Sequence, residues 1–500
     1  MIYTDTRISK QCATFSYTAE RKEGIRMKKL KILPLLLCLF IVFQTAGCKK
    51  AGEDPEITTD SGKTPDETTA AETLRGPKLP DEKFDGETFT IYTRSYSKDS
   101  FIVESTGDIL DDAVHKRIVD TEEALGVKIE SHNNPDDDYG TEAKNTILSG
   151  DDAYQLLCGH ARMMFNYPQS DLVLDWYELP YIDFSNKWWD DNMIESLSIG
   201  GKIYVVADDL TSNALGNTKA LLFNKDLFTK YSQEFPYKKV LDMNWTFDEF
   251  EKLCKVFAKD LNGDSEMKLE DDQFGFGTSI WGAPIIMLWS AGQRIYDTTG
   301  KDGRIELVLN TQRTVEVFDR FFTLLGSECS CVGTVTASFK EGRFAFMSGS
   351  LNGLTATRDM NDDIGIIPFP MLDADQGRYY TGVDASCNGL AVPITVENTG
   401  MASAVIEYMS YLCYRDIMPV FYDVVLKTKS SRDDESAAMI DIIRESRLYD
   451  IGYFYNGLPM NSVGAELALM SDPNFSSYYA QNESAAKAAL AEINEYYFGK

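Results

Sequence analysis

Residues 198–228 read SIGGKIYVVADDLTSNALGNTKALLFNKDLF, and the rest of the chain is organised around this stretch. Residues 203–207 are a short apolar run typical of a strand, residues 208–219 are polar without periodicity, and residues 220–223 are a second apolar run. Asn224 follows the second run and is suited to begin a helix, because its side-chain oxygen accepts unpaired backbone N–H groups. We interpret the stretch as a hinge crossing, in which the chain passes from one half of the protein to the other.

The chain before this stretch alternates strand and helix patterns. Residues 88–93 alternate apolar and polar side chains as a strand does, and residues 110–125 have helical spacing and end at Gly126. Residues 127–130 and 154–157 are further strand patterns. This alternation predicts an α/β sheet whose ligand-binding loops lie at the carboxyl ends of the strands.

The chain after the stretch continues the alternation. Residues 245–257 are an amphipathic helix pattern in which Thr246 and Glu249 have the spacing of a capping box. Residues 274–282 are typical of a strand that ends in an aromatic loop flanked by glycines. We expect further strands at residues 344–347, 364–370 and 389–393, and further helices at residues 284–291, 315–325, 401–414 and in most of the chain from Ala437, with Tyr453 in a loop.

Length and charge limit the class of protein. A chain of 500 residues is long enough for two domains or lobes with large cores. The formal net charge is −29, and the 41 basic and 75 acidic residues after position 47 give that part a net charge of −34. So acidic a chain repels phosphate backbones, which argues against nucleic-acid binding.

Cysteine and histidine usage gives little support for a metal enzyme. The nine cysteines form no recognisable disulfide framework, and Cys329 and Cys331 are too close for an easy mutual bridge. We expect the cysteines beyond the leader to be small buried side chains, and whether any of them pair stays open. The only histidines are His115, His132 and His160, and no HExxH motif is present.

The first 47 residues are typical of a signal peptide. A lysine-rich segment from Met27 precedes the apolar run at residues 32–43, which is too short to span a membrane as a mature helix. Cys48 follows Thr-Ala-Gly, a pattern that resembles the lipobox of bacterial lipoproteins, in which this cysteine is acylated. We expect translation to begin at Met27 and lipidation to occur at Cys48. An ordinary secretory signal with an incidental cysteine is the alternative.

Residues 48–83 are rich in Asp, Glu, Thr, Pro and Gly. Such a composition cannot bury enough apolar surface to fold, so the segment predicts a disordered tether.

The order of these features resembles family 1 extracellular solute-binding proteins, which serve carbohydrate ABC importers. The resemblance extends over nearly the whole chain after the tether and depends on order and spacing rather than on any one segment. It is carried by Cys48, LDDAV at 110–114, GDDAY at 150–154, IGGKIY at 199–204, LLFNKDL at 221–227, WTFDEF at 245–250, FKEGRFAF at 339–346 and GIIPFP at 365–370.

This resemblance implies a two-lobed α/β fold of the periplasmic-binding-protein type (type II), with lobes that close on a ligand about a multi-crossing hinge. By analogy, one lobe comprises residues 84–217 and 372–413, and the other comprises residues 218–371 and 414–500. It also implies a lipid-anchored monomer on the outer face of the cytoplasmic membrane that delivers a sugar to an ABC transporter permease.

Physical chemistry selects candidate ligand residues. A sugar needs planar, bidentate polar partners for its hydroxyl groups and aromatic rings for its C–H faces. Most of the candidates follow a predicted strand or lie at a crossing. They are Arg94, Tyr96, His160, Arg162, Asp209, Asn217, Trp281, Asn352 and Tyr453.

Several of these residues have simpler interpretations. Trp281 could equally be a core tryptophan, and Asp208 with Asp209 could be solvated turn residues. His160 is better explained as a satisfied polar residue than as a catalytic base. Trp188 and Trp189 are better explained by packing within a lobe than by ligand stacking, because no strand end precedes them.

An acidic loop is spaced like a calcium site. Its candidate ligands are Asp260, Asn262, Asp264, Glu266 and Asp271. Ser265 replaces the glycine of the sharp turn, and Lys268 occupies the ninth position, so a non-binding turn is the favoured interpretation. We therefore expect no cofactor, with a structural calcium ion as the alternative.

A secreted glycoside hydrolase is the rival function, because it would also be acidic and aromatic-rich and needs two carboxylates across a cleft. No nucleophile elbow, phosphate loop or metal motif supports an enzyme. A binding protein for a non-sugar solute, such as a peptide, is a third possibility with the same fold.

Overall fold

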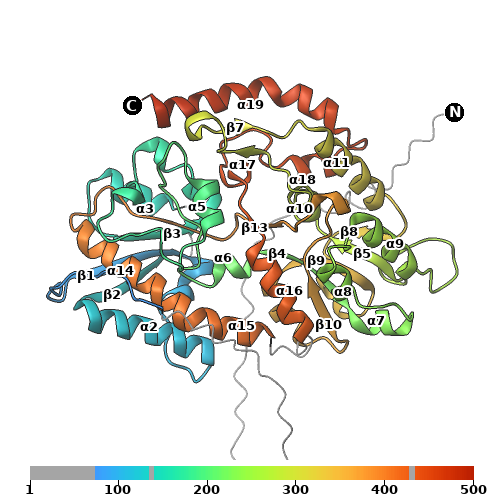
Figure 1. Ribbon diagram of the computed structural model, residues 1–500, viewed down its shortest axis with the longest axis horizontal. Coiled ribbons are helices and arrows are strands. Elements are labelled where there is room, and N and C mark those ends of the chain that lie inside the picture. The colour runs from blue at the N-terminus through green and yellow to red at the C-terminus, as the bar shows by residue number, and fades with distance from the viewer. Residues whose placement is uncertain (1–73, 135–139, 427–433, 500) are drawn as a thin grey trace, which may run out of the picture. The chain divides into compact units, whose positions relative to one another are not determined.

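A computed structural model of the chain describes residues 74–134, 140–426 and 434–499 (Figure 1). The expected signal peptide, the lipidation site at Cys48 and most of the expected tether lie outside these residues. The chain from Gly76 onward belongs to one compact unit.

The first sheet has four strands in the order β12-β3-β1-β2. Strands β1, β2 and β3 are parallel, and β12 pairs antiparallel with β3. Helix α2 (Ile109–Leu125) connects β1 to β2, as the β-α-β pattern predicts, and Gly126 ends it with φ 65°. The strands are β1 (Thr88–Arg94), β2 (Lys128–Asn134), β3 (Leu156–His160) and β12 (Asn388–Ala391).

The second sheet has five strands in the order β10-β4-β9-β5-β8. Strand β4 is antiparallel to both of its neighbours, whereas β5 is parallel to β8 and β9. The strands are β4 (Lys219–Asn224), β5 (Phe274–Thr278), β8 (Ser330–Val332), β9 (Phe344–Ser350) and β10 (Ile364–Ile367). Two short pairs complete the strands: β6 (Tyr296–Asp297) with β7 (Glu306–Leu307), and β11 (Thr381–Gly382) with β13 (Arg447–Leu448).

Helices flank both sheets (Figure 1). Those that precede β4 are α2, α3 (Thr141–Leu148), α4 (Ala161–Met164), α5 (Asp191–Leu197) and α6 (Asn213–Gly216). Between β4 and β10 the chain forms α7 (Lys225–Lys230), α8 (Tyr237–Leu241), α9 (Phe247–Phe257), α10 (Ala283–Ser290), α11 (Gln312–Leu325), α12 (Thr336–Lys340) and α13 (Leu351–Ala356). After β12 come α14 (Thr399–Leu412), a π-helical turn (Cys413–Ile417), α15 (Met418–Leu426), α16 (Asp434–Glu445), α17 (Ile451–Phe454), α18 (Val463–Ala468) and α19 (Phe475–Phe498). Short 3-10 turns occupy Ser95–Ser100, Pro168–Ser170, Trp176–Glu178, Lys301–Gly303 and Ala374–Gln376.

The stretch at residues 198–228 is only partly as predicted. Its second apolar run is β4, and Asn224 caps α7 by accepting the Leu227 N–H, which confirms that prediction. The strand expected at residues 203–207 is wrong, because only Val206 pairs, in a single bridge with Leu390 of β12. The run is apolar because it is buried beside the sheet, not because it forms a ladder.

Three other local predictions need correction. The strand expected at residues 154–157 begins and ends later, at Leu156–His160. The expected capping box does not form: Thr246 stands at the N-cap of α9 without a side-chain capping bond, and Glu249 pairs with Lys239 (Nζ to Oε2, 2.9 Å). Tyr453 lies in α17 rather than in a loop.

The core of the second sheet is aromatic. Phe346 on β9 contacts Phe228, Trp245, Phe250 and Phe257, with ring centroids 5.2 to 6.3 Å apart. Burial of each such ring stabilises the fold by about 2 kcal/mol. These rings hold α7 and α9 against the sheet and so give the loops at its ends a rigid support.

Trp188 and Trp189 pack against α14, in line with the predicted packing within a lobe. Both indole rings are buried, and their Nε1–H groups donate to the two carboxylate oxygens of Glu407 on α14, each at 3.1 Å. The tryptophans therefore fasten the segment before α5 to α14.

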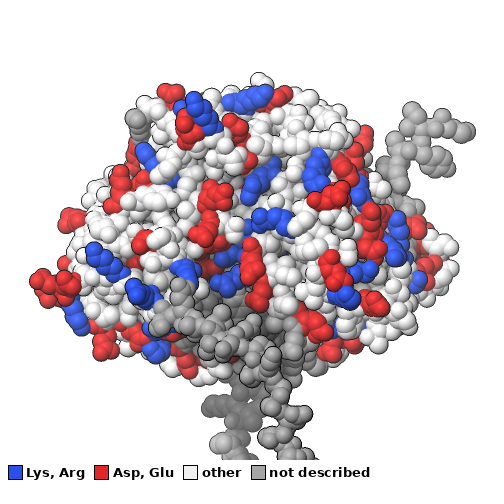
Figure 2. Space-filling view, viewed as in Figure 1, with Lys and Arg blue, Asp and Glu red and all other residues white. Residues whose placement is uncertain are grey.

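The described cysteines Cys158, Cys254, Cys329, Cys331, Cys387 and Cys413 are all unpaired and buried, in line with their expected role as small core residues. Within the described part of the chain, no helix is both long and apolar enough to span a bilayer. On the face shown in Figure 2, acidic and basic side chains are interspersed.

Candidate ligand-binding site

The segment from Val383 to Asn388 links the two sheets and lies at the centre of the candidate site. Thr218, which precedes β4 of the second sheet, forms an antiparallel bridge with Val383. The Asp384 N–H donates to the Asn217 carbonyl at 3.3 Å. The expected crossing at Asn217 therefore runs beside a second segment that leads into the first sheet.

Arg94 is the last residue of β1 and binds this segment through its side chain. Its Nη2 donates to the Ser386 carbonyl at 2.5 Å and to Asn388 Oδ1 at 3.4 Å. Ser97 Oγ also donates to Asn388 Oδ1, at 2.5 Å. Because Arg94 is almost fully buried, its guanidinium fixes this segment from within the core.

His160 and Arg162 lie beside the same segment. His160 ends β3 and pairs in register with Asn388. The next peptide continues this contact, since the Ala161 N–H donates to the Cys387 carbonyl at 3.1 Å. The Arg162 side chain lies over the Tyr453 ring, with Cζ 4.8 Å from the ring centroid, and donates from Nη2 to Ser462 Oγ at 3.3 Å. Arg162 therefore joins the end of β3 to α17, far along the chain.

Asn217 and Asn352 meet at α6. Asn217 Nδ2 donates to the Asn213 carbonyl at 2.8 Å, and Asn213 Oδ1 accepts the Asn388 N–H at 2.8 Å. The exposed carboxamide of Asn352, on α13, lies so close to Gly216 that a Cβ there would be 2.5 Å from it. With the side chain of Asn352 in this position only glycine fits at residue 216, and the approach brings a residue of α13 against the crossing.

Lys219 and Asp384 form an ion pair that sequence reasoning missed. Their Nζ and Oδ2 atoms are 2.6 Å apart, and the Ser386 N–H donates to Asp384 Oδ1 at 2.8 Å. Burial alone would raise the pKa of Asp384, but the charge and hydrogen bond of Lys219 outweigh it, and the pKa is lowered. Only its position in the sequence could have indicated Lys219 as a site residue, since it lies two residues after the predicted crossing at Asn217.

Two aromatic candidates have different environments. Trp281 is 60% exposed between β5 and α10, so the interpretation as a core tryptophan is wrong and its ring is open to a ligand. Tyr453 is buried between Arg162 and Trp289, whose ring centroid is 5.0 Å away. Tyr96 lies in the 3-10 turn after β1, and its side chain is outside the described part.

Asp209 does not join this cluster. Its carboxylate accepts two hydrogen bonds from the Arg447 guanidinium, at 2.9 and 2.8 Å, and lines a separate cavity of ≈ 300 Å³. Asp208 and Asp209 are only 2% and 9% exposed, so the interpretation as solvated turn residues is wrong. Burial, and then the charges of Asp209 and Asp190, raise the pKa of Asp208.

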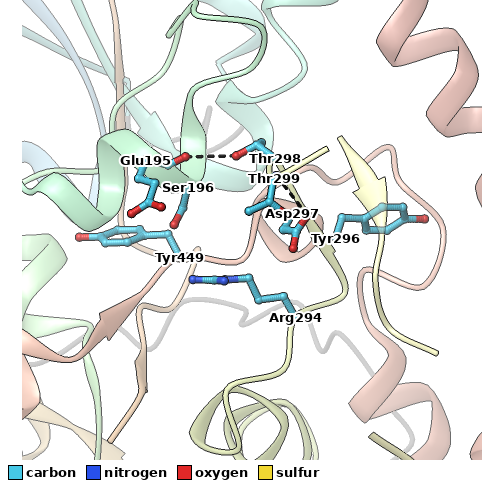
Figure 3. A pocket seen from close by; sticks show the side chains of 8 residues that line it. All are labelled: Glu195, Ser196, Arg294, Tyr296, Asp297, Thr298, Thr299 and Tyr449. Atoms are coloured by element: carbon cyan, nitrogen blue, oxygen red, sulfur yellow. Dashed lines mark hydrogen bonds between the residues drawn. The ribbon is translucent and has the colours of Figure 1, made fainter. Parts of the chain in front are cut away.

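A further cavity lies where α5 faces residues 294–299 (Figure 3). Arg294 points into it, and Thr298 Oγ1 closes one side by donating to the Glu195 carbonyl at 3.1 Å. Its volume of ≈ 30 Å³ is about that of one water molecule. It is therefore too small for a sugar ring.

The acidic loop at residues 260–271 is held by its own hydrogen bonds. Asp260 accepts the N–H groups of Gly263 and Ser265, and Lys268 pairs with both Asp264 and Glu266. A lysine among the candidate ligands supplies the positive charge that calcium would otherwise provide. In the described residues, no group of His, Cys, Asp or Glu has the arrangement of a metal site.

No family model matches the sequence, and no curated protein is similar to it in sequence. Many solved structures match its fold. The cyclic α-maltosyl-1,6-maltose binding protein from Arthrobacter globiformis is 14% identical, with a TM-score of 0.53 over 83% of this chain and 100% of that one. An ABC substrate-binding protein from Listeria monocytogenes in complex with cycloalternan is 14% identical, with a TM-score of 0.50 over 82% of this chain and 99% of that one. A maltose/maltodextrin-binding domain from Bdellovibrio bacteriovorus bound to maltotriose is 15% identical, with a TM-score of 0.50 over 81% and 99%.

At these identities the likeness shows the fold. The chain has the two-lobed α/β fold of periplasmic-binding-protein type, which confirms the fold class expected from its sequence. The lobe boundaries given above remain a prediction.

Proposed function

We propose that this protein is a solute-binding protein that captures a sugar or oligosaccharide by lobe closure and delivers it to an ABC transporter permease. The single observation that supports this most strongly is the set of polar residues along the segment from Val383 to Asn388. Asn217, Arg162 and His160 lie beside this segment, and Asn352 approaches the crossing next to it. Amide and guanidinium groups of this kind suit sugar hydroxyls. The similar solved structures named above bind saccharides, which supports the same ligand class.

The electrostatics of the cluster favour binding over hydrolysis. A glycosidase of the usual kind needs a carboxylic acid of raised pKa opposite a second carboxylate. Asp384 has a lowered pKa because Lys219 neutralises it, and such a group is poorly suited to donate a proton at neutral pH. Asp208 has a raised pKa but is shut away from solvent in the core. We therefore propose reversible binding, with no bond made or broken.

Thermal-shift screening of the protein against neutral and acidic mono- and oligosaccharides tests the proposal. A ligand at a hundredfold excess over Kd stabilises the folded state by about 2.7 kcal/mol, which gives a clear rise in Tm. Stabilisation without release of reducing ends supports the proposal. Release of reducing ends would make the protein an enzyme, and stabilisation by peptides alone would keep the fold and change the ligand class.

We propose further that Cys48 is acylated and that the protein is anchored to the outer face of the cytoplasmic membrane as a monomer. The lipobox-like pattern supports this. A tethered receptor would supply ligand to the permease at high effective concentration. Mass spectrometry of the N-terminal peptide, isolated from bacterial membranes, would detect the lipid on Cys48. A Cys48→Ala chain that stays in the membrane fraction would contradict the anchor.

A further inference from the structure

Two arginines of the candidate site form no ion pair with any carboxylate that the structure describes. Arginines elsewhere differ in this respect: Arg447 pairs with Asp209 and Arg313 with Asp373, whereas the buried Arg117 donates to the carbonyls of Leu210 and Ser100. Arg94 bonds only neutral oxygens, of Ser386, Asn388 and Ser97. The Arg162 guanidinium donates to one described group, the Ser462 hydroxyl. A guanidinium that is partly removed from water without a counter-ion is electrostatically uncompensated.

Of the two, Arg162 is the one able to meet a ligand. Its guanidinium lies over the Tyr453 ring, and Tyr453 is itself fixed against Trp289. This stacking holds the planar group in one orientation and uses none of its in-plane N–H donors. Arg162 Nε is shielded from solvent and has no hydrogen-bond partner. A pre-organised guanidinium edge with unused donors matches the two coplanar oxygens of a carboxylate.

Two carboxylates whose charges act on Tyr453, those of Asp384 and Asp450, are already engaged. Asp384 is paired with Lys219 and accepts the Ser386 N–H. Asp450, close to Tyr453, accepts N–H groups from Trp289, Ile295 and Gly452. With Arg94, Arg162 and Lys219 set against Asp384 and Asp450, the formal charge of these described residues is positive in a chain of net charge −29. Such a local reversal of sign attracts an anion.

We propose that the ligand is an acidic saccharide, one that contains a uronic acid residue, and that Arg162 binds its carboxylate. This inference rests on the proposed function and specifies its substrate class. A neutral sugar also offers hydroxyls to an arginine, but only an anionic group compensates the charge. Hydrogen bonds to charged groups are worth about twice those between neutral groups, so the uronate should bind at least tenfold tighter than its neutral counterpart.

The experiment is isothermal titration of the full chain with oligosaccharides matched in linkage and length, each in a uronate and a neutral form. The probes are α-1,4-linked galacturonate and galactose oligomers and β-1,4-linked glucuronate and glucose oligomers. We expect one uronate series to bind at least about tenfold tighter than its neutral match, with an affinity that falls as salt is raised. Equal or tighter binding of the neutral form would overturn the acidic class and leave the proposed function standing. Binding of no saccharide in either form would overturn both.

Variants of Arg162 assign the contact. Arg162→Gln should abolish the preference for the uronate, whereas Arg162→Lys should retain part of it because the charge remains. Arg358→Gln is the matched control. It removes a positive charge from an exposed position just after the end of α13, and we expect the affinity to be unchanged. Circular dichroism and Tm verify that each variant is folded. A folded Arg162→Gln chain that keeps its uronate preference would show that another group binds the carboxylate.

Discussion

Glu407 offers a sharp test of how burial and hydrogen bonding compete in this fold. The residue lies on α14 with none of its surface exposed, and its carboxylate accepts four hydrogen bonds. The donors are the indole N–H groups of Trp188 and Trp189, Asn186 Nδ2 at 2.8 Å and the Asp183 N–H at 3.4 Å. Burial nevertheless raises the pKa of Glu407 to about 7, which the hydrogen bonds from Asn186 and the tryptophans only partly oppose.

The sign of the pH effect follows from this raised pKa. Between the ordinary value of 4.5 and about 7 the folded chain holds a proton at Glu407 that the unfolded chain has lost. The contribution of Glu407 to the free energy of unfolding is therefore fully present below pH 4.5 and falls as pH rises through 7. A shift of this size corresponds to about 3 kcal/mol.

Glu407→Gln removes the titrating group and keeps its size. At pH 5 the variant should be less stable than the unchanged chain by about 1–3 kcal/mol, because the added amide N–H leaves a buried donor without an acceptor. From pH 5 to pH 8 this deficit should shrink by about 3 kcal/mol and can reverse in sign, because only the unchanged chain must bury a charge at the higher pH.

Urea unfolding followed by tryptophan fluorescence at pH 5, 6, 7 and 8 measures the difference directly, since both indoles that contact Glu407 report on unfolding. Glu397→Gln, the same change at an exposed position, is the control and should shift stability by less than about 0.5 kcal/mol at every pH. A Glu407→Gln deficit that stays constant from pH 5 to pH 8 would refute the reasoning.

Four further predictions concern the hinge region and the acidic loop. Arg447→Met leaves Asp209 buried without its counter-ion and should lower the free energy of unfolding by about 3–5 kcal/mol in urea; a loss below 1 kcal/mol would contradict a structural role for the pair. The ionised Asp384 contributes to the free energy of unfolding above the ordinary Asp pKa, and this contribution is lost as pH falls through the lowered pKa of the folded chain. Asp384→Asn should therefore be less stable than the unchanged chain at pH 7 and should lose less stability on acidification. Acid titration followed by circular dichroism measures both effects. Asn217→Ala should weaken saccharide binding about tenfold in calorimetry with little change in Tm, and an unchanged affinity would remove Asn217 from the site. Calcium added to metal-free protein should produce no heat and no rise in Tm, because Lys268 already pairs with Asp264; a stoichiometric heat signal would show that the loop is a calcium site.

The expected elements were found where local pattern alone decides structure. Helix α2 has its helical spacing and its terminal glycine within one segment, and β4 has its apolar run followed directly by the capping Asn224. The strand predicted at residues 203–207 was wrong because the prediction depended only on an apolar run. An apolar run reports burial, and burial beside a sheet is indistinguishable in sequence from pairing within it.

The candidate site could be predicted only in part. His160 and Arg162 were selected because they follow a strand, and Asn217 because it lies at the expected crossing; the structure places all three beside the segment from Val383 to Asn388. Asp209 satisfied the same rule and yet belongs to a buried ion pair with a residue 238 positions away. No local signal marks such a partner.

By itself the sequence determined most of the alternation of strands and helices and the acidic character of the chain, because each depends on neighbouring residues or on composition. Only the tertiary structure decided which charges meet. With 78 acidic and 49 basic side chains, almost any pairing is compatible with the sequence. Lys219 with Asp384, Arg447 with Asp209, and Arg162 without a carboxylate follow from the three-dimensional packing of segments far apart in the chain. The ion pair beside the expected crossing at Asn217 and the arginine without a carboxylate therefore depend on contacts between distant segments, which local sequence does not encode.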